Sequence, residues 1–247
     1  MNSKEFITEV QSIDEILDEI SKIYNIEFKV MNKMQAIARG AGMKLNVIEP
    51  LIQISQQCQS YIQTVGWDNC FDLYRGIPEY SEFIKKRVRL DNRIPKSMDP
   101  YLFEEINKYF TEAYGAPFRN AMLCTGQLSH TRLFGEAYMV FPIGDFKYLW
   151  HPEVNDLNFA SANFRNSDIV QNNVEGSVWG TKNRDLINDL FLNEYIKKID
   201  WQTTDMSTAV ASNVEIMIRT KAYHGVRYKD HKMDIYEMTE IMKLAVK

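Results

Sequence analysis

Three short strings of the sequence contain side chains that could do chemistry. Arg75 stands in LYRG at the end of a short apolar run, Thr125 stands in LCTG, and Glu215 stands in NVEI. An arginine that leaves a strand into a turn can hold an anion through paired, charge-assisted hydrogen bonds, or it can be a solvated turn residue. The alternation around Glu215 also fits an ordinary strand whose glutamate faces solvent. Each residue by itself leaves both roles open.

The first part of the chain is predicted to be helical. Apolar residues recur at three- and four-residue spacing over residues 13–24, and again from Leu51 to Val65, which is typical of amphipathic helices. Residues 39–50 contain two glycines and a proline, which indicate a loop or a broken helix. We therefore expect a helical unit over residues 1–66.

Residues 67–247 change to short apolar pieces separated by turns. The strand candidates are CFDLYRG, NAMLCTG, AYMVFPIG, FKYLWHP and VEIMIRTKAYHGVRY. Two helices are predicted between them, one beginning after Asp99 and ending at Gly115, and one over residues 184–199. The asparagine-rich stretch 158–183 indicates surface loops. The sequence thus predicts an α+β protein.

Composition excludes several classes of protein. Of the 247 residues, 45% are hydrophobic and 25% are charged, as in soluble globular proteins. The net charge of -4 argues against bulk attachment to nucleic acid or to an anionic membrane. The N-terminus lacks the features of a signal peptide, and no apolar run approaches the roughly 20 residues that span a bilayer. A cytoplasmic protein without a membrane anchor is therefore expected.

Metal and disulfide chemistry are not indicated. The three cysteines, Cys58, Cys70 and Cys124, are an odd number without CxxC spacing, which fits a reducing cytosol. The four histidines show neither HExxH nor another paired spacing of zinc ligands. We therefore expect no metal site.

In order and with their flanks, the three strings resemble the ADP-ribosyltransferase superfamily of the arginine, serine, glutamate type. That family carries an arginine on its first core strand, a Ser-Thr-Ser-like strand followed by a short helix, and a late Glu-x-Glu strand. The small-residue turn and the strand ending in FPIG, within residues 123–144, are similar to uncharacterised phage-encoded members. The resemblance covers residues 70–228. It implies a mixed, split β-sheet core behind an N-terminal helical unit, with NAD as substrate in the cleft between the sheets.

The resemblance also implies roles for single residues. Arg75 is expected to hold the pyrophosphate of NAD, and Gly76 to let the backbone approach the ligand. Glu215 is expected to face the positive charge that develops on the ribose when nicotinamide leaves, and Asn213 to face the acceptor. The expected NAD-binding residues are Arg75, Gly76, Cys124, Thr125, Gly126 and Phe134.

Two departures from the family pattern bear on the reaction. Where the family has Ser-Thr-Ser, only Thr125 retains a hydroxyl, because Cys124 and Gly126 flank it. Where the family has its first acidic or amide residue, Asn213 can orient a nucleophile but cannot ionise to act as its base. Transfer to an acceptor other than arginine and simple hydrolysis of NAD therefore stay open.

The implied function is transfer of ADP-ribose from NAD to a macromolecular acceptor in the cytoplasm of a phage-infected bacterium. A host protein is favoured over nucleic acid as the acceptor. The alternative is a catalytically inactive relative that binds a host protein, or that binds nucleic acid through the basic stretch at residues 85–93. For that stretch, a solvated face balanced by nearby acids is the preferred interpretation.

Overall fold

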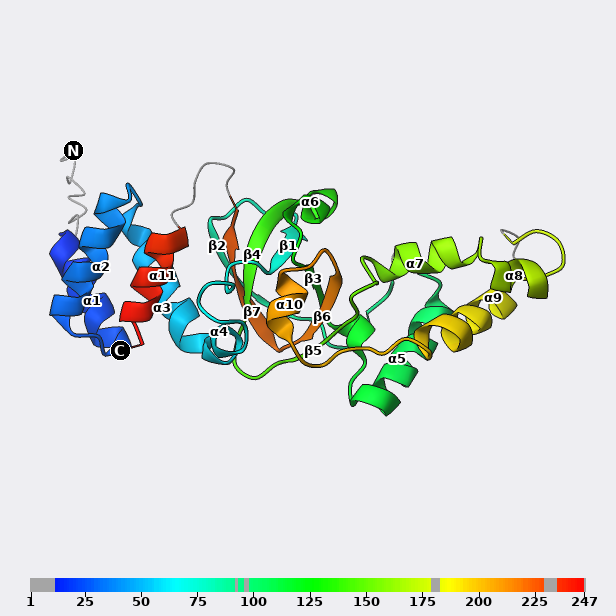
Figure 1. Cartoon of the computed structure of the whole chain (residues 1–247). Coiled ribbons are helices and arrows are strands. Elements are labelled where there is room, and N and C mark those ends of the chain that lie inside the picture. Colours follow the sequence, from blue (N-terminus) through cyan, green and yellow to red (C-terminus); the bar gives the residue numbers. More distant parts are fainter. Residues whose placement is uncertain (1–11, 92, 96–97, 179–182, 229–234, 247) are drawn as a thin grey trace, which may run out of the picture. The chain divides into compact units, whose positions relative to one another are not determined.

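The chain folds into one helical unit and one unit built on a β-sheet, as the computed structural model in Figure 1 shows. The structure describes residues 12–91, 93–95, 98–178, 183–228 and 235–246. The helical unit comprises Met1–Gln57 and Lys232–Lys247, and the sheet unit comprises Cys58–His231. The α+β class predicted from the sequence is confirmed.

The helical unit takes its last helix from the far end of the chain. Its helices are α1 (Ile13–Tyr24), α2 (Phe28–Gly40), the 3-10 turn η1 (Leu45–Val47), α3 (Ile48–Gln57) and α11 (Ile235–Leu244). A capping box starts α1, because the Ser12 side chain accepts from the Glu15 backbone N–H while the Glu15 carboxylate accepts from the Ser12 N–H. Figure 1 shows α11, in red, beside α2 and α3, which it contacts. Neither α2 nor α11 was predicted from the sequence.

The predicted division into residues 1–66 and 67–247 therefore differs from the two units in two places. Helix α4 (Gln59–Val65) contacts α10 (Met206–Val210) and belongs to the sheet unit. Helix α11 buries Met238, Ile241 and Met242 within the helical unit. An apolar helix face is buried wherever the tertiary structure offers it a partner, and sequence order does not decide this.

The sheet unit contains a seven-stranded sheet in the order β2-β7-β4-β1-β3-β6-β5. The strands are β1 (Tyr74–Ile77), β2 (Phe83–Arg87), β3 (Met122–Thr125), β4 (Glu136–Pro142), β5 (Lys147–Trp150), β6 (Glu215–Arg219) and β7 (Ala222–Arg227). Every described strand pair is antiparallel, so the expectation of a mixed sheet was wrong. All five strand candidates contain strands, whereas β2, which overlaps the basic stretch at residues 85–93, was not predicted.

The sheet is nearly divided between β1 and β3. These strands are joined at one registered pair, Tyr74 with Thr125, whereas every other pair of neighbouring strands is registered over most of its length. The division separates β2-β7-β4-β1 from β3-β6-β5. We call the place where β1 and β3 diverge the strand split.

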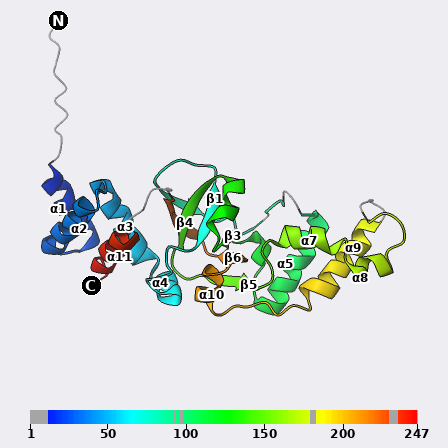
Figure 2. The same cartoon turned by 45° about the horizontal axis from the view of Figure 1, so that its top comes forward.

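Helices of the sheet unit pack beside the β3-β6-β5 half. They are α5 (Pro100–Tyr114), α7 (Leu157–Phe164), α8 (Asp168–Asn173), α9 (Arg184–Phe191) and the π-helical turn η5 (Leu192–Ile196). Figures 1 and 2 show these helices gathered beyond β5 and β6. Their apolar side chains form one buried cluster with Leu149 of β5 and Met217 of β6. This cluster is the main core on that side of the sheet.

Helix α5 begins and ends as predicted, because Asp99 caps its N-terminus and Gly115 adopts a left-handed conformation at its end. The expectation of surface loops over residues 158–183 was wrong for α7 and α8. The Asp156 side chain caps α7, and Phe164 and Val170 are buried in the core cluster. Residues 179–182 of that stretch lie outside the described residues. Each helix is too short to show a clear apolar period in the sequence.

Short helical turns complete the sheet unit around the strand split. They are η2 (Phe118–Asn120) before β3, α6 (Leu128–Thr131) and η3 (Arg132–Phe134) between β3 and β4, and α10 before β6. Helix α6 contacts β1 and β3, and η2 contacts β6. These turns place side chains from outside the sheet next to the strands that carry Arg75, Thr125 and Glu215.

Candidate functional site

The three strings singled out in the sequence lie on three neighbouring strands. Tyr74 of β1 is registered with Thr125 of β3, and Thr125 is registered with Glu215 of β6. Residues in register across an antiparallel pair share a face of the sheet, so the three side chains form one row across the strand split. Arg75 follows Tyr74 directly. The fold therefore makes the strands of Arg75, Thr125 and Glu215 neighbours, and it places Thr125 and Glu215 on one face of the sheet.

Arg75 lies at the strand split and bridges it. Its side chain is half-buried, and its Nη1 donates to the backbone carbonyl of Leu123 in β3 at 3.0 Å. Because side chains alternate along a strand, Arg75 leaves β1 in the direction opposite to Tyr74. Within the described residues, no hydrogen bond or ion pair joins Arg75 to Glu215. Among the described residues, Arg75 is thus joined to β3 and not to Glu215.

Glu215 pairs instead with Arg119 of η2. Arg119 Nη1 donates to Glu215 Oε1, and both side chains are buried, with exposed fractions of 3% and 8%. Arg119 also lies against Met217, with 3.7 Å between Nη1 and Sδ. Burial raises the pKa of the Glu215 carboxyl, and the charge of Arg119 opposes that rise by favouring the carboxylate. Arg119 is therefore the nearby charge that most favours the ionised form of Glu215.

Arg93 completes a group of cations near the split. Its Nη1 donates to the carbonyl of Ala121 at 2.8 Å and to that of Arg119 at 3.4 Å. Burial lowers the pKa of Arg93, the positive charges of Arg119 and Arg75 lower it further, and Glu215 acts in the other direction. We call Arg75, Arg93 and Arg119 the arginine cluster. The charges of Arg119 and Arg93 thus act on the buried Glu215, and that of Arg75 acts on Arg93, so an anion near the cluster would be stabilised electrostatically.

Two of the expected NAD-binding glycines are explained by packing. A Cβ on Gly76 would collide with the carbonyl oxygen of Thr131 and with the side chain of Phe134, because α6 and η3 lie directly on β1. A Cβ on Gly126 would collide with the backbone of Val210 and Ser212. The space above each glycine is filled by the chain itself. These glycines let the turns approach the strands, which is a structural role.

The other expected residues differ in exposure. Cys124 is buried, and burial raises the pKa of its thiol to about 12, so the thiol is neutral near pH 7. The Thr125 Oγ1 accepts from the backbone N–H of Gln127 at 3.1 Å, in the turn that leads to α6. Asn213 is exposed in the bend before β6, and the Phe134 side chain is 64% exposed on η3. Only these last two present most of their side chain to solvent.

Comparison with protein-family models, with curated proteins and with solved structures found no match. Among the residues that the structure describes, no helix is both long enough and apolar enough to cross a membrane. In the same part of the chain, no group of three His, Cys, Asp or Glu side chains is placed to hold a metal ion. The assignment of function therefore depends on the geometry of the site and on the family resemblance.

The basic stretch at residues 85–93 is partly engaged in structure. Strand β2 forms one edge of the sheet, and Lys86 makes an ion pair with Glu79. Charged side chains on an edge strand oppose pairing with other chains. Arg93, at the end of the stretch, bonds inward to Ala121. Lys85, Arg87 and Arg89 are exposed.

Nothing in the sequence marks Arg119 as the partner of Glu215. It follows Pro117 and Phe118 in a short turn, where nothing local distinguishes it from a surface arginine. Its partner, Glu215, lies 96 residues further along the chain. Only the pairing of β3 with β6, next to η2, brings the two side chains together.

Proposed function

We propose that this protein transfers ADP-ribose from NAD to a macromolecular acceptor, with a host protein favoured over nucleic acid. The observation that carries the proposal is that β1, β3 and β6, the strands of Arg75, Thr125 and Glu215, are neighbours across the strand split. The family pattern needs an arginine strand, a hydroxyl strand followed by a short helix, and a glutamate strand. Here these are β1, β3 followed by α6, and β6, which are neighbours in the sheet.

The arginine cluster supports binding of the pyrophosphate. Arg75 donates to the Leu123 carbonyl and also interacts with the side chains of Cys124 and Tyr223. Its planar guanidinium has five N–H donors and matches phosphate oxygens in pairs. Arg93 and Arg119 add two further positive charges in a poorly solvated region. The pyrophosphate of NAD carries about two negative charges, which the cluster would balance.

Glu215 supplies the carboxylate of the proposed reaction. The bond between the ribose C1′ and nicotinamide breaks, and its electron pair leaves with nicotinamide. Glu215 then faces the positive charge on the ribose, while the acceptor forms the new bond to C1′ and its proton passes to solvent. Because Arg119 occupies Oε1 of Glu215, binding of the pyrophosphate must draw Arg119 away from the carboxylate. Asn213, exposed two residues before Glu215, would orient the acceptor.

Radiolabelled NAD tests the proposal directly. The pure protein and a bacterial lysate are incubated with NAD labelled in the adenylate phosphate, and nicotinamide release and labelled macromolecules are measured. Glu215→Gln keeps the size of the side chain and removes its charge, so we expect at least a hundredfold loss of turnover. Glu104→Gln, on the exposed face of α5, is the matched control and should retain wild-type turnover. Unchanged turnover in Glu215→Gln would rule out its assigned role.

A second candidate is a catalytically inactive protein that binds a host macromolecule. The buried pair of Arg119 and Glu215 favours it, because a carboxylate held by an internal guanidinium is withheld from a substrate. The replacement of two family serines by Cys124 and Gly126 favours it as well. Binding of NAD without release of nicotinamide, with every acceptor fraction of the lysate, would support this candidate over transfer.

A further inference from the structure

A group of positively charged residues surrounds the turn between β6 and β7. Lys221 lies in this turn, and its carbonyl accepts from the backbone N–H of Val88 at 2.9 Å. Val88 stands between Arg87 and Arg89 in the chain, so both arginines lie next to the turn. Arg87 is also registered with Ala222, the first residue of β7. Two arginines of the basic stretch are thereby placed beside a lysine of the turn.

Two more cations come from the other half of the sheet. Arg219, the last residue of β6, is registered with Lys147, the first residue of β5, which places their Cα atoms about 5 Å apart. Arg219 Nη1 also reaches the carbonyl of Leu90, directly after Arg89, at 3.5 Å. Three separate parts of the chain thus contribute to one place. We call its five cations the turn patch: Arg87, Arg89, Lys147, Arg219 and Lys221.

The charges of the turn patch are not balanced by ion pairs. Within the part of the chain that the structure describes, none of the five side chains pairs with an acid, whereas the neighbouring Lys86 pairs with Glu79. Arg219 is half-buried, and the other four side chains are exposed. Asp91 and Asp145 are the acids within two residues of the patch in sequence, so the cations outnumber them. The patch therefore carries excess positive charge, although the whole chain is acidic.

The chemistry of the turn patch favours a phosphate backbone over an acidic protein as its partner. Protein interfaces are built around an apolar core with aromatic anchors. Among the described residues, no exposed large apolar side chain lies within two residues of the patch along the chain. In nucleic-acid binding, by contrast, the part of the affinity that is independent of sequence comes from Lys and Arg on phosphates. Three of the five cations are arginines, whose planar donors match phosphate oxygens in pairs.

The aromatic residues near the patch favour a duplex over a single strand. Proteins that hold single strands stack the bases on accessible aromatic side chains. The chain neighbours of Lys147, which are Phe146 and Tyr148, are half-buried and stack on each other, with 5.8 Å between ring centroids. Phe146 also packs against Tyr61, and Tyr223 of β7 is buried. These rings are therefore occupied by the protein itself.

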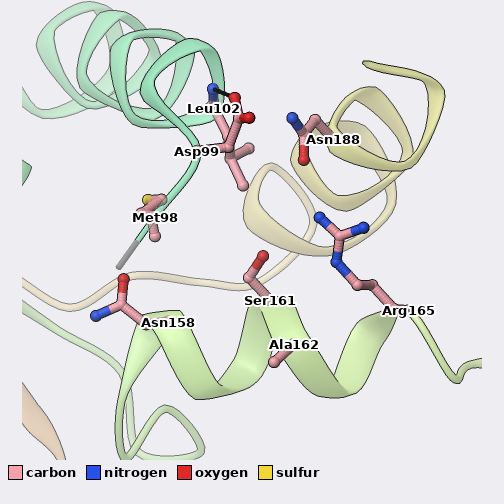
Figure 3. A pocket seen from close by; sticks show the side chains of 8 residues that line it. All are labelled: Met98, Asp99, Leu102, Asn158, Ser161, Ala162, Arg165 and Asn188. Carbon is pink, nitrogen blue, oxygen red and sulfur yellow. Dashed lines mark hydrogen bonds between the residues drawn. The ribbon is translucent and has the colours of Figure 1, made fainter. Parts of the chain in front are cut away.

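We propose that the turn patch binds the phosphate backbone of a nucleic-acid duplex. A duplex needs an open surface and not a cavity. None of the five residues lines the cavity of about 100 Å³ that Figure 3 shows between α5, α7 and α9. None of them belongs to the arginine cluster either, so the patch is separate from the site proposed for NAD.

Fluorescence anisotropy of the whole protein with a labelled DNA duplex of about 20 base pairs tests the proposal. Titrations are made without NAD at salt concentrations from about 50 to about 200 mM, and we expect log affinity to fall against log salt with a slope of about -3 to -5. A single strand of the same length, polyglutamate and vesicles of anionic phospholipid are titrated separately. We expect the duplex to bind more tightly than each of them.

Two double variants test whether the fold assembles the patch. Arg87→Gln with Arg89→Gln removes the charges that come from the basic stretch. Lys147→Gln with Lys221→Gln removes charges that come from other parts of the chain. Each double variant should weaken duplex binding about tenfold and make the salt slope shallower by about 2.

The matched control changes the net charge by the same amount elsewhere. Lys29→Gln with Lys33→Gln, at exposed positions of α2, should bind the duplex as the wild type does. Thermal unfolding checks that all variants are folded. An equal loss in this control, an unchanged salt slope in Lys147→Gln with Lys221→Gln, or tighter binding of the single strand, polyglutamate or vesicles would overturn the proposal. None of these outcomes depends on turnover of NAD.

Discussion

Arg119 and Glu215 form a buried ion pair between a short turn and a sheet strand, 96 residues apart in the chain. Two charges removed from water stabilise a protein only when each has its partner, because the loss of solvation is large. Here the partner of Glu215 comes from outside the sheet, through η2. Under the proposed function, this pair would have to open before the carboxylate of Glu215 meets a ligand.

Removal of Arg119 should destabilise the protein strongly. Arg119→Met leaves the Glu215 carboxylate buried without a positive partner, and we expect a loss of about 3–5 kcal/mol in the free energy of unfolding. The double variant Arg119→Met with Glu215→Gln removes both charges and should recover a large part of that loss. Unfolding in urea at pH 7 measures both. Lys198→Met, which breaks an exposed ion pair with Glu194, is the control and should change nothing measurable.

A methyl group added at Gly126 should destabilise the protein. A Cβ on Gly126 would lie 2.1 Å from the carbonyl oxygen of Val210 and 2.4 Å from that of Ser212, so Gly126→Ala must displace the segment that leads into β6. We expect a loss of about 1–3 kcal/mol. Gly40→Ala is the matched control, because nothing lies within 4 Å of its Cβ position. Thermal unfolding of both variants checks the difference, and equal stability of the two would contradict the packing role of Gly126.

Arg75 should be required for NAD binding as a guanidinium and not merely as a positive charge. Arg75→Lys keeps the charge but loses the paired donors and the bridge to Leu123, so we expect NAD affinity to fall about tenfold or more. Isothermal titration calorimetry measures this. Arg39→Lys, at an exposed position of α2, is the control. Wild-type affinity in Arg75→Lys would show that Arg75 does not hold the pyrophosphate.

His224 should make the stability of the sheet unit depend on pH. It is buried on β7 opposite Lys85, and burial lowers its pKa to about 4, with the charge of Lys85 acting in the same direction. The unfolded chain, with a histidine pKa near 6.5, binds a proton first as the pH falls. Stability is therefore full above about pH 6.5 and is lost as the pH falls toward about 4, by on the order of 1–3 kcal/mol.

The variant His224→Gln isolates this contribution. Without the histidine, the decline in the free energy of unfolding between about pH 6.5 and pH 4 should become shallower than in the wild type. Urea unfolding at a series of pH values measures the slope in both proteins. Parallel slopes would mean that other groups cause the decline.

Elements with local signals could be predicted from the sequence. The sequence around helix α5 predicts where it begins and ends. Asp99 caps its N-terminus, Pro100 lies in its first turn and Gly115 ends it, as expected. The β-rich middle and end of the chain were recognisable because apolar runs and turns alternate there. Helices α7 and α8 were missed because their buried faces are short and surrounded by asparagines. Strand β2 was not predicted because Lys85 and Lys86 interrupt its apolar pattern.

The sequence by itself determined which residue types were present for chemistry and in what order, from Arg75 through Thr125 to Glu215. It also determined the local elements whose caps, turns and apolar periods lie within a few residues of one another. Only the tertiary structure decided that β1, β3 and β6 are neighbours, that Arg119 pairs with Glu215, and that Arg219 meets the basic stretch at Leu90. The physical reason is that strand order and buried ion pairs join residues far apart in the chain, and no local pattern encodes that separation.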